Sequence, residues 1–391
     1  MNPQIPENWI KVKFKQLAKE KSVRVDNPGE SGYEKYVGLE HLDSGELVVK
    51  KCGSTSDVTS TMKLFKKEDI LFARRNTYLR RVSVAPFDGV CSGDIIVLEP
   101  ILKHIVKGFL PIFMQFEPFE NKIIALSAGA FSKRIKWGQL SEEEVVIPSI
   151  EEQKKIVEMI WSIQDNIEKV EHIISGYEKL NRGLSNDLLT KGIGHTQFKE
   201  TEVGIIPDTW EVSTIGESCS IENNLRKPIN AETRKQIKGF YPYYGPTGII
   251  DYINEYRLEG RYVLIGEDGD HFFKYKDWSM TQLVVGKFNV NNHAHVIRGI
   301  NNCLTEWVYH YFRHRDITPH LTRQGAARFK LKKATLIELP LAIPPKKEQE
   351  TIYNILDNVH AIMEKTSLHV DCLKNLKKYL TDKFLSGEVR V

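Results

Sequence analysis

Two long segments of the chain carry apolar residues in alternating steps of four and three. In the first, the repeated positions are Ile156, Ile160, Ile163, Ile167, Val170, Ile174, Tyr177, Asn181, Leu184 and Leu188. In the second, they are Ile352, Leu356, Val359, Met363, Thr366, Val370, Leu373, Lys377, Leu380 and Phe384. Sustained 4–3 spacing places these side chains on one stripe of an α-helix and is typical of a coiled-coil seam. The pattern therefore predicts two long helices, each with an apolar stripe to bury.

The two helical segments are copies of each other. Residues 147–190 align without a gap to residues 343–386, so equivalent residues differ by 196 in number. Identical pairs include Ile147/Ile343, Pro148/Pro344, Glu152/Glu348, Gln153/Gln349, Ile156/Ile352, Glu168/Glu364, Lys169/Lys365, Leu184/Leu380 and Leu189/Leu385. Upstream, Gly129-Ala130 matches Gly325-Ala326 at the same offset, and both halves open on a related Ile-Pro-x-x-Trp segment, Ile5–Trp9 and Ile206–Trp210. The chain therefore contains two copies of one plan.

Between these anchors the two halves diverge, and their pattern is mostly that of β-strands. Short apolar or β-branched runs separated by Gly, Asp and Asn predict strands at Glu46–Lys50, Asp69–Ala73, Asp94–Leu98, Tyr262–Ile265 and Gln282–Val285. Shorter helices are predicted at 104–117 and 305–314. The predicted fold class is α+β, with globular domains at 1–148 and 192–344 and long helices at 149–191 and 345–391.

The length of the predicted helices limits how they are buried. Ser149 and Glu152 predict a capping box at the first helix start, whereas the second copy has Pro345 there. About 38 residues at about 1.5 Å each give roughly 57 Å, too long for burial in one small domain. Antiparallel pairing of the two helices about a pseudo-two-fold axis is the simplest solution. The alternative is two independent helices, each docked on its own domain.

Composition adds few constraints. The 391-residue chain has a net charge of +4, which permits an anionic partner without requiring one. Its five cysteines are scattered and never in CxxC spacing, so we expect reduced thiols in a cytoplasmic protein. The N-terminus lacks the apolar region of a secretory signal, and no run of 18 apolar residues predicts a membrane span.

Catalytic and cofactor-binding motifs are missing from the sequence. It contains neither a GxxxxGK[ST] phosphate loop nor the Asn-Pro-Pro-aromatic motif of amino-methyltransferases, so we expect a chain that is not an enzyme on its own. The segment 266–270 favours a Gly/Asp turn over a calcium loop. His293 and His295 lack further zinc ligands at useful spacing. On a strand they would share one face, which suits either DNA contact or a polar core.

Basic clusters supply the candidate DNA-contacting residues. The densest, in a predicted loop, contains Arg74, Arg75, Asn76, Thr77, Tyr78, Arg80 and Arg81. Guanidinium groups pair with guanine or phosphate, and Asn pairs with adenine, although a solvated turn with local ion pairs is the alternative. Residues just before the long helices are candidates for phosphate contact: Lys133, Arg134 and Lys136 in the first half, and Arg323, Gln324, Arg328 and Lys330 in the second. The remaining candidates for DNA contact are Tyr243, Tyr244, His293 and His295. For the two tyrosines, a packed turn is the alternative.

The chain resembles the specificity subunit of type I restriction–modification systems, because its duplicated segments follow one another in the order found in that family. The resemblance covers the full length. It rests on the Ile-Pro-x-x-Trp openings, the Ile-Pro-x-x-x-Glu-Gln helix entries at Ile147–Gln153 and Ile343–Gln349, and the helix exits near Leu188–Thr190 and Phe384–Gly387. Tyr36–Glu40, Arg74–Thr77, Tyr243–Gly248 and Asn291–Val296 look like parts of that family's target recognition domains.

The resemblance implies a non-catalytic targeting subunit for defence against foreign DNA. Each recognition domain would bind one half of a bipartite site in double-stranded DNA, and the helices would set the spacing and dock two methyltransferase subunits. Those subunits would bind S-adenosylmethionine and methylate adenine N6, so this chain would hold no cofactor or metal. Motor-nuclease restriction subunits would join for cleavage. Roughly 57 Å of helix corresponds to at most about 17 base pairs, and half-sites near one DNA turn apart are expected.

Two other functions fit parts of the sequence. One is the targeting subunit of a self-contained system whose partner is a fused nuclease–methyltransferase. The other is a coiled-coil scaffold that does not read DNA. Arg74, Arg75 and Asn76 argue against the scaffold because it needs no loop suited to base contacts.

Overall fold

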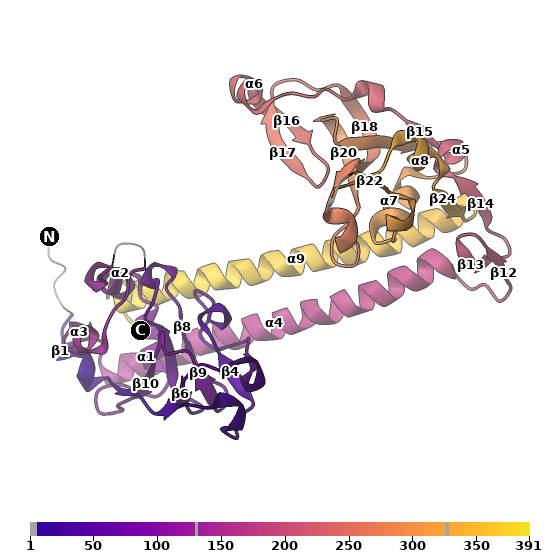
Figure 1. The fold of residues 1–391 in the computed structure, drawn as a ribbon. Coiled ribbons are helices and arrows are strands. Elements are labelled where there is room, and N and C mark those ends of the chain that lie inside the picture. The colour runs from indigo at the N-terminus through magenta and orange to yellow at the C-terminus, as the bar shows by residue number, and fades with distance from the viewer. Residues whose placement is uncertain (1–5, 130–131, 325–327) are drawn as a thin grey trace. The chain divides into compact units, whose positions relative to one another are not determined.

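The chain divides into two compact units, each of which contains part of both long helices (Figure 1). Unit 1 comprises Met1–Ile173 and Thr366–Val391, and unit 2 comprises Ile174–Lys365. The computed structural model describes residues 6–129, 132–324 and 328–391, without the side chains of Arg323, Gln324 and Arg328. The repeat positions Ile5, Ala130, Gly325 and Ala326 lie outside the described residues.

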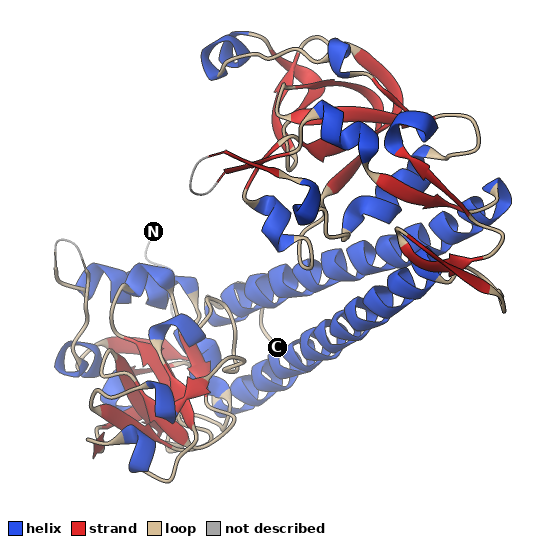
Figure 2. Ribbon diagram, turned by 45° about the vertical axis from the view of Figure 1, so that its right-hand side comes forward, coloured by secondary structure: helices blue, strands red, loops and turns tan. Residues whose placement is uncertain are grey.

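Unit 1 combines two small sheets with short helices (Figure 2). The four-stranded sheet has the order β2 (Ala18–Lys21), β10 (Ile95–Pro100), β7 (Ile70–Ala73) and β8 (Val82–Val84). The five-stranded sheet has the order β3 (Arg24–Val25), β6 (Met62–Phe65), β9 (Gly89–Cys91), β4 (Lys35–Val37) and β5 (Gly53–Ser54). The helices are α1 (Phe109–Met114), α2 (Glu117–Leu126) and α3 (Trp137–Ser141), and 3₁₀ turns lie at Phe14–Gln16, Pro28–Glu30, Leu39–His41, Thr55–Asp57 and Thr77–Leu79.

Unit 2 is built on a six-stranded sheet. Its order is β15 (Cys219–Ile221), β21 (Ala294–Gly299), β18 (Leu258–Gly266), β20 (Thr281–Val290), β16 (Lys238–Tyr244) and β17 (Ile249–Ile253). A smaller sheet joins β19 (Asp268–Gly269), β23 (Arg328–Lys330) and β22 (Thr322–Gln324), and β12 (Phe198–Thr201) pairs with β13 (Gly204–Pro207). Short helices are α5 (Ile215–Ser218), α6 (Ala231–Gln236), α7 (Thr305–Arg313) and α8 (Lys333–Glu338), and 3₁₀ turns lie at Asn223–Leu225, His271–Lys274 and Thr318–His320.

The same frame closes both units. In unit 1, β1 (Ile10–Lys13) pairs antiparallel with β11 (Glu144–Ile147). In unit 2, β14 (Glu211–Thr214) pairs antiparallel with β24 (Pro340–Ile343). In both cases the second strand leads directly into a long helix, α4 (Ile150–Thr190) or α9 (Lys346–Leu385). The predicted repeat is therefore a structural repeat, and it brings the two ends of each variable region together.

Helices α4 and α9 run antiparallel within each unit. In unit 1, Lys377 of α9 bonds Gln164 of α4 at 2.7 Å, while the later residue Arg390 bonds the earlier Glu152. In unit 2, the first turns of α9 share a core with Leu188 near the end of α4. The residues of the predicted 4–3 stripe are all buried or half-buried, because that stripe faces the partner helix and the domain core. The antiparallel pairing predicted from the repeat is confirmed inside each unit.

Two of the local predictions differ from the structure, one entirely and one in its bounds. Residues 46–50 form no strand, and only Val48 makes a single bridge, to Val84. The segment instead bends to bring Glu46 against the long helices, as its ion pair with Lys374 at 3.0 Å shows. The predicted helix 104–117 starts only after Gly108, whose φ of 85° does not fit a right-handed helix. By contrast, the predicted helix at 305–314 is found as α7.

Candidate nucleic-acid interface

The structure joins the two basic clusters of unit 1 into one surface. The loop that carries Arg74–Arg81 connects β7 to β8. The second basic segment runs beside it: Asn76 N–H donates to the Lys133 carbonyl at 2.8 Å, and Arg75 forms a backbone bridge with Arg134. Asn76 adopts a left-handed conformation with φ of 54°, which turns the chain at this contact. About 55 residues apart in sequence, the two clusters become neighbours only in the fold.

One carboxylate orients the two central arginines of this surface. Arg75 and Arg134 both lie 3.4 Å from the carboxylate of Asp94, and their side chains stay 43% and 50% exposed. Arg75 also donates from Nε to the Ser132 hydroxyl at 2.9 Å. A shared carboxylate restrains both guanidinium groups while leaving part of each exposed to solvent. This geometry suits contact with phosphate or a guanine edge.

Other predicted residues of this loop are engaged inside unit 1. Thr77 is 4% exposed, and its hydroxyl donates to Ser127 at 2.8 Å. Arg80 pairs with Glu120 at 3.1 Å, and Arg81 donates to the Leu39 carbonyl at 2.7 Å. These contacts hold the loop against the rest of the unit, so we assign the three residues to its framework.

The remaining predicted residues of unit 1 differ in exposure. Tyr78 is 54% exposed, and Lys133 and Lys136 are also exposed. Arg74 is half-buried, and its Nε has no hydrogen-bond partner among the described residues. The exposed members can meet a ligand directly.

Burial separates the candidates of unit 2. Tyr243 is 1% exposed; its hydroxyl donates to the Lys227 carbonyl at 3.0 Å and accepts from Ile229 N–H at 2.9 Å. The Tyr244 ring is half-buried and meets Phe288 edge-on at 5.8 Å. Tyr243 is thus a packing residue, and burial leaves its ring unable to contact a base.

The two histidines of unit 2 also have different surroundings. His295 is 1% exposed and lies between the Leu331 carbonyl at 2.7 Å and the Asn223 amide at 2.9 Å. Burial lowers the pKa of His295, and the neutral ring serves as donor to one neighbour and acceptor from the other. His293 is exposed and lies 3.0 Å from the Asp268 carboxylate. Of this pair, His293 alone has a ring placed to meet a ligand.

The basic residues before α9 lie on a hairpin. Arg323 and Gln324 belong to β22 and Arg328 to β23, but their side chains lie outside the described part of the structure. Lys330, at the end of β23, pairs with Glu267 at 3.1 Å. In the repeat, this hairpin of unit 2 corresponds to the segment of unit 1 that contains Lys133 and Arg134.

Backbone contacts show which loop positions correspond in the two units. In unit 1, Ile135 N–H donates to the Arg74 carbonyl at 3.1 Å, and in unit 2 Leu331 N–H donates to the Glu267 carbonyl at 2.8 Å. Ile135 and Leu331 are equivalent at the offset of 196. The next residues also correspond, because Arg75 bridges Arg134 and Asp268 pairs with Lys330.

Equivalent positions therefore carry opposite charges in the two units. Arg74 and Arg75 of unit 1 are replaced by Glu267 and Asp268 in unit 2. Glu267 forms ion pairs with Arg226, at 2.7 Å, and with Lys330. Asp268 remains 34% exposed beside His293. Sequence alignment alone does not show this exchange, because the loops differ in length and only the backbone bonds establish the register.

The helix entries contain structural residues that the sequence analysis did not assign. Gln153 is completely buried. Its Oε1 accepts from Val106 N–H at 3.0 Å, and its Nε2 donates to the carbonyls of His104 and Pro148. Gln349 makes the same three types of bond in unit 2. The only hint in the sequence to this structural role is that the glutamine is identical in both copies of the repeat.

The preceding glutamates hold the opening tryptophans. Trp9 donates from Nε1 to Glu152 at 3.0 Å, and Trp210 donates to Glu348 at 3.1 Å. Burial favours the protonated form of Glu152, but donors that include Arg390 outweigh it and leave its pKa below the usual value. The predicted capping interaction is present in part, because Glu152 N–H donates to the Ser149 hydroxyl at 3.3 Å, while the Glu152 carboxylate binds the tryptophan. The duplicated motif therefore ties the start of each variable region to its end.

Among the residues that the structure describes, no three His, Cys, Asp or Glu side chains are grouped to hold a metal ion. Within the same ranges, no helix combines the length and apolar character needed to span a membrane. All five cysteines are free.

Comparisons with known proteins agree with the repeat. A family model described as the type I restriction modification DNA specificity domain matches residues 6–176 and again 207–370. The putative type I specificity subunit S.HindORF215P of Haemophilus influenzae is 40% identical over 152 residues, which cover 39% of this chain and 38% of that protein. The putative MjaX specificity subunit of Methanocaldococcus jannaschii is 24% identical over 416 residues, covering 99% of this chain and 95% of the relative.

Solved structures share the fold. The type I restriction–modification S subunit from M. genitalium superposes with a TM-score of 0.63 at 17% identity, covering 98% of this chain and 97% of that chain. A structure from work on assembly and conformational transition of the type I R-M system gives a TM-score of 0.56 at 19% identity, covering 99% of this chain and 100% of that chain. The predicted α+β architecture with duplicated domains and long helices is confirmed. The chain belongs to the family of type I restriction–modification DNA specificity subunits, and two copies of the family's domain make up most of its length.

Proposed function

We propose that each unit reads one half of a bipartite DNA sequence and that the two halves differ. The observation that supports this is the exchange of charge at equivalent loop positions, Arg74 and Arg75 against Glu267 and Asp268. Guanidinium groups donate to guanine edges and phosphates, whereas carboxylates accept from the amino group of cytosine. Two loops of opposite polarity on one backbone frame favour two unlike half-sites.

We further propose that partner subunits perform the chemistry. Two methyltransferase subunits with bound S-adenosylmethionine would methylate adenine N6, and motor-nuclease subunits would cleave unmodified DNA. Family membership supports this assembly, and the duplicated frame supports its stoichiometry, because two equivalent frames offer two equivalent docking surfaces. Native mass spectrometry of the purified complex tests the ratio, and a single methyltransferase per chain at saturation would contradict it.

The assignment of half-sites is tested with reciprocal variants. Sequencing of methylated adenines in a host that carries the chain and its methyltransferase first defines the site. Arg75→Ala with Arg134→Ala should then weaken binding at one half-site by about tenfold or more, since a good bidentate contact contributes about 1–3 kcal/mol of discrimination. Asp268→Asn is the matched change in unit 2 and should affect only the other half. Duplexes scrambled in one half at a time separate the effects.

The reciprocal design distinguishes base reading from general DNA affinity. If the arginine pair made only non-specific phosphate contacts, both half-sites would weaken together, and the assignment would be refuted. If Asp268→Asn altered the half-site assigned to unit 1, the correspondence between units and half-sites would be wrong.

We also propose that the helices set the spacing between the half-sites. Both α4 and α9 contribute residues to both units. Insertion of seven residues into each helix at the unit boundary keeps the apolar stripe nearly in phase and adds about 10.5 Å, or about three base pairs. The methylated site should keep its bases and gain a longer gap. An unchanged gap in methylome sequencing would exclude this role for the helices.

A further inference from the structure

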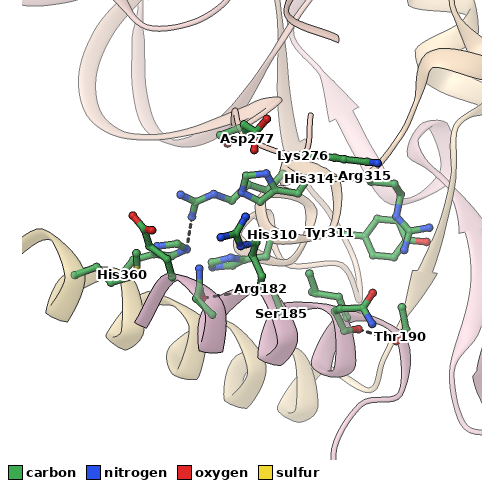
Figure 3. A pocket seen from close by; sticks show the side chains of 17 residues that line it. Arg182, Ser185, Thr190, Lys276, Asp277, His310, Tyr311, His314, Arg315 and His360 are labelled. Atoms are coloured by element: carbon green, nitrogen blue, oxygen red, sulfur yellow. Dashed lines mark hydrogen bonds between the residues drawn. The ribbon is translucent and has the colours of Figure 1, made fainter. Parts of the chain in front are cut away.

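Unit 2 contains a cavity of about 940 Å³ beside the long helices. Its lining comes from the last turns of α4, from α7 and the residues after it, from the segment around Lys276, and from α9. Figure 3 labels Arg182, Ser185 and Thr190 on the α4 side, with Lys276, His314 and Arg315 across from them. The labelled side chains are mostly polar or basic, so this is not an apolar groove.

Positive charge dominates the lining. Four cationic side chains, Arg182, Lys276, Arg313 and Arg315, face two exposed carboxylates, Glu178 and Asp277.

None of the four cations has an ion pair with a carboxylate among the residues that the structure describes. Cations without ion pairs around one cavity create a positive potential that attracts an anion.

Two of these arginines are partly withdrawn from water. Arg313 is half-buried; its guanidinium donates to His360, and its Nε is buried with no partner in the described part of the chain. Arg315 is half-buried with its guanidinium 3.8 Å from the centre of the Tyr311 ring. A guanidinium keeps its charge in proteins, so partial burial without a direct ion pair is costly. An anion in the cavity would offset that cost.

Unit 1 has a cavity at the equivalent place in the repeat. At the offset of 196, four of the seven α4 positions that line the cavity of unit 2 correspond to Lys374, Lys377, Lys378 and Thr381, which line a smaller cavity of about 290 Å³ in unit 1.

There, Glu46 accepts ion pairs from Lys50 at 2.7 Å and from Lys374 at 3.0 Å. Its neighbour Gly45 accepts a bond from Lys377 at 2.9 Å. Unit 1 therefore supplies an anion from its own chain.

In the described part of unit 2, Glu178 and Asp277 line the same cavity, but no carboxylate forms an ion pair with the four cations. We propose that the cavity of unit 2 binds a phosphate-type oxyanion from outside the chain. Several guanidinium groups around one space favour phosphate, because each presents a planar fork of donors that matches two oxygens. The phosphate can belong to a free phosphate compound or to the DNA backbone. The proposal does not depend on which bases the units read.

The direct test is calorimetric titration of the full chain with inorganic pyrophosphate at constant pH and ionic strength. We expect one site. Arg182→Gln should weaken it about tenfold, the effect of losing one charge-assisted contact. Arg182 is exposed, so its replacement leaves the cores intact. Lys378→Gln is the matched control, because residue 378 is the exposed equivalent of residue 182 in unit 1 and should leave pyrophosphate binding unchanged.

A second variant imitates unit 1. Ser185→Glu introduces a carboxylate at the cavity wall, and it should raise the thermal unfolding midpoint without pyrophosphate and abolish pyrophosphate binding. Absence of a site in the wild-type chain, equal effects of Arg182→Gln and Lys378→Gln, or full binding by Ser185→Glu would each overturn the proposal.

Competition identifies the source of the phosphate. If a DNA duplex without the recognition site displaces pyrophosphate, and Arg182→Gln weakens that DNA, the cavity binds backbone phosphate. If DNA does not displace pyrophosphate and binds the wild-type chain and Arg182→Gln equally, the cavity binds a free phosphate compound. Both results support an oxyanion site in unit 2.

Discussion

Replacement of Gln349 by Met should destabilise unit 2 strongly. The side chain is completely buried. Its Oε1 accepts from Leu304 N–H at 2.9 Å, and its Nε2 donates to the carbonyls of Asn302 at 2.7 Å and Pro344 at 2.8 Å. Methionine has nearly the same volume but makes none of these bonds, so the variant leaves three backbone groups without partners.

The magnitude follows from those three groups. An unsatisfied buried donor or acceptor costs about 1–3 kcal/mol, and relaxation or a penetrating water recovers part of it. A total loss of about 3–6 kcal/mol is expected, which is a large share of the roughly 5–15 kcal/mol that stabilises a typical domain. Lost packing contributes little because methionine fills the space.

Two measurements provide the assay, chemical denaturation and, separately, hydrogen exchange. Denaturation measures the loss of unfolding free energy, and exchange should rise in peptides around residues 302–304 and 344. Gln153→Met is the matched variant, since Gln153 makes the same type of bonds in unit 1. It should raise exchange around residues 104–106 instead. A loss below about 1 kcal/mol for both variants would refute the idea that this glutamine clamps the helix entry.

Two further predictions concern buried ionisable groups in unit 1. Burial lowers the pKa of Lys377 from 10.5 to about 8, so the unfolded chain binds the proton more tightly and the free energy of unfolding should rise between pH 8 and 10.5. Lys377→Met should remove this rise in urea titrations; an unchanged pH slope would contradict it. Burial raises the pKa of Glu120 from 4.5 to about 7 despite Arg80, so stability should fall as pH increases from 4.5 to 7. Glu120→Gln should flatten that fall, and a slope equal to the wild-type slope would show that other groups cause it.

The sequence predicted the long helices and their pairing because these depend on local periodicity, and it revealed the repeat through identical residues at a constant offset of 196. A stripe such as Ile156, Ile160 and Ile167 must be buried along its whole length, and a second copy of the same stripe offers the matching surface. Local pattern failed at residues 46–50, where a short apolar and β-branched run favours a strand. Contacts between Glu46 and lysines of α9 and of its own segment decide the conformation there.

The candidate surface was less predictable because residue type does not specify burial. Tyr243 and His295 have side chains suited to contact DNA, yet both are buried in unit 2 and bonded to its backbone. The union of the loop at Arg75 with the segment at Arg134 depends on backbone bonds between residues far apart in sequence.

The sequence alone was enough to establish two copies of one plan, because identical residues recur at a constant offset of 196. It also predicted the long helices, because an apolar stripe that needs burial repeats along each of them. The fold was needed to show that Arg75 and Asp268 occupy equivalent positions with opposite charge, and that Glu46 lines the cavity of unit 1 while basic side chains line the larger cavity of unit 2. These relations arise from non-local contacts, in which each side chain is placed by partners that no neighbouring residue in the sequence specifies.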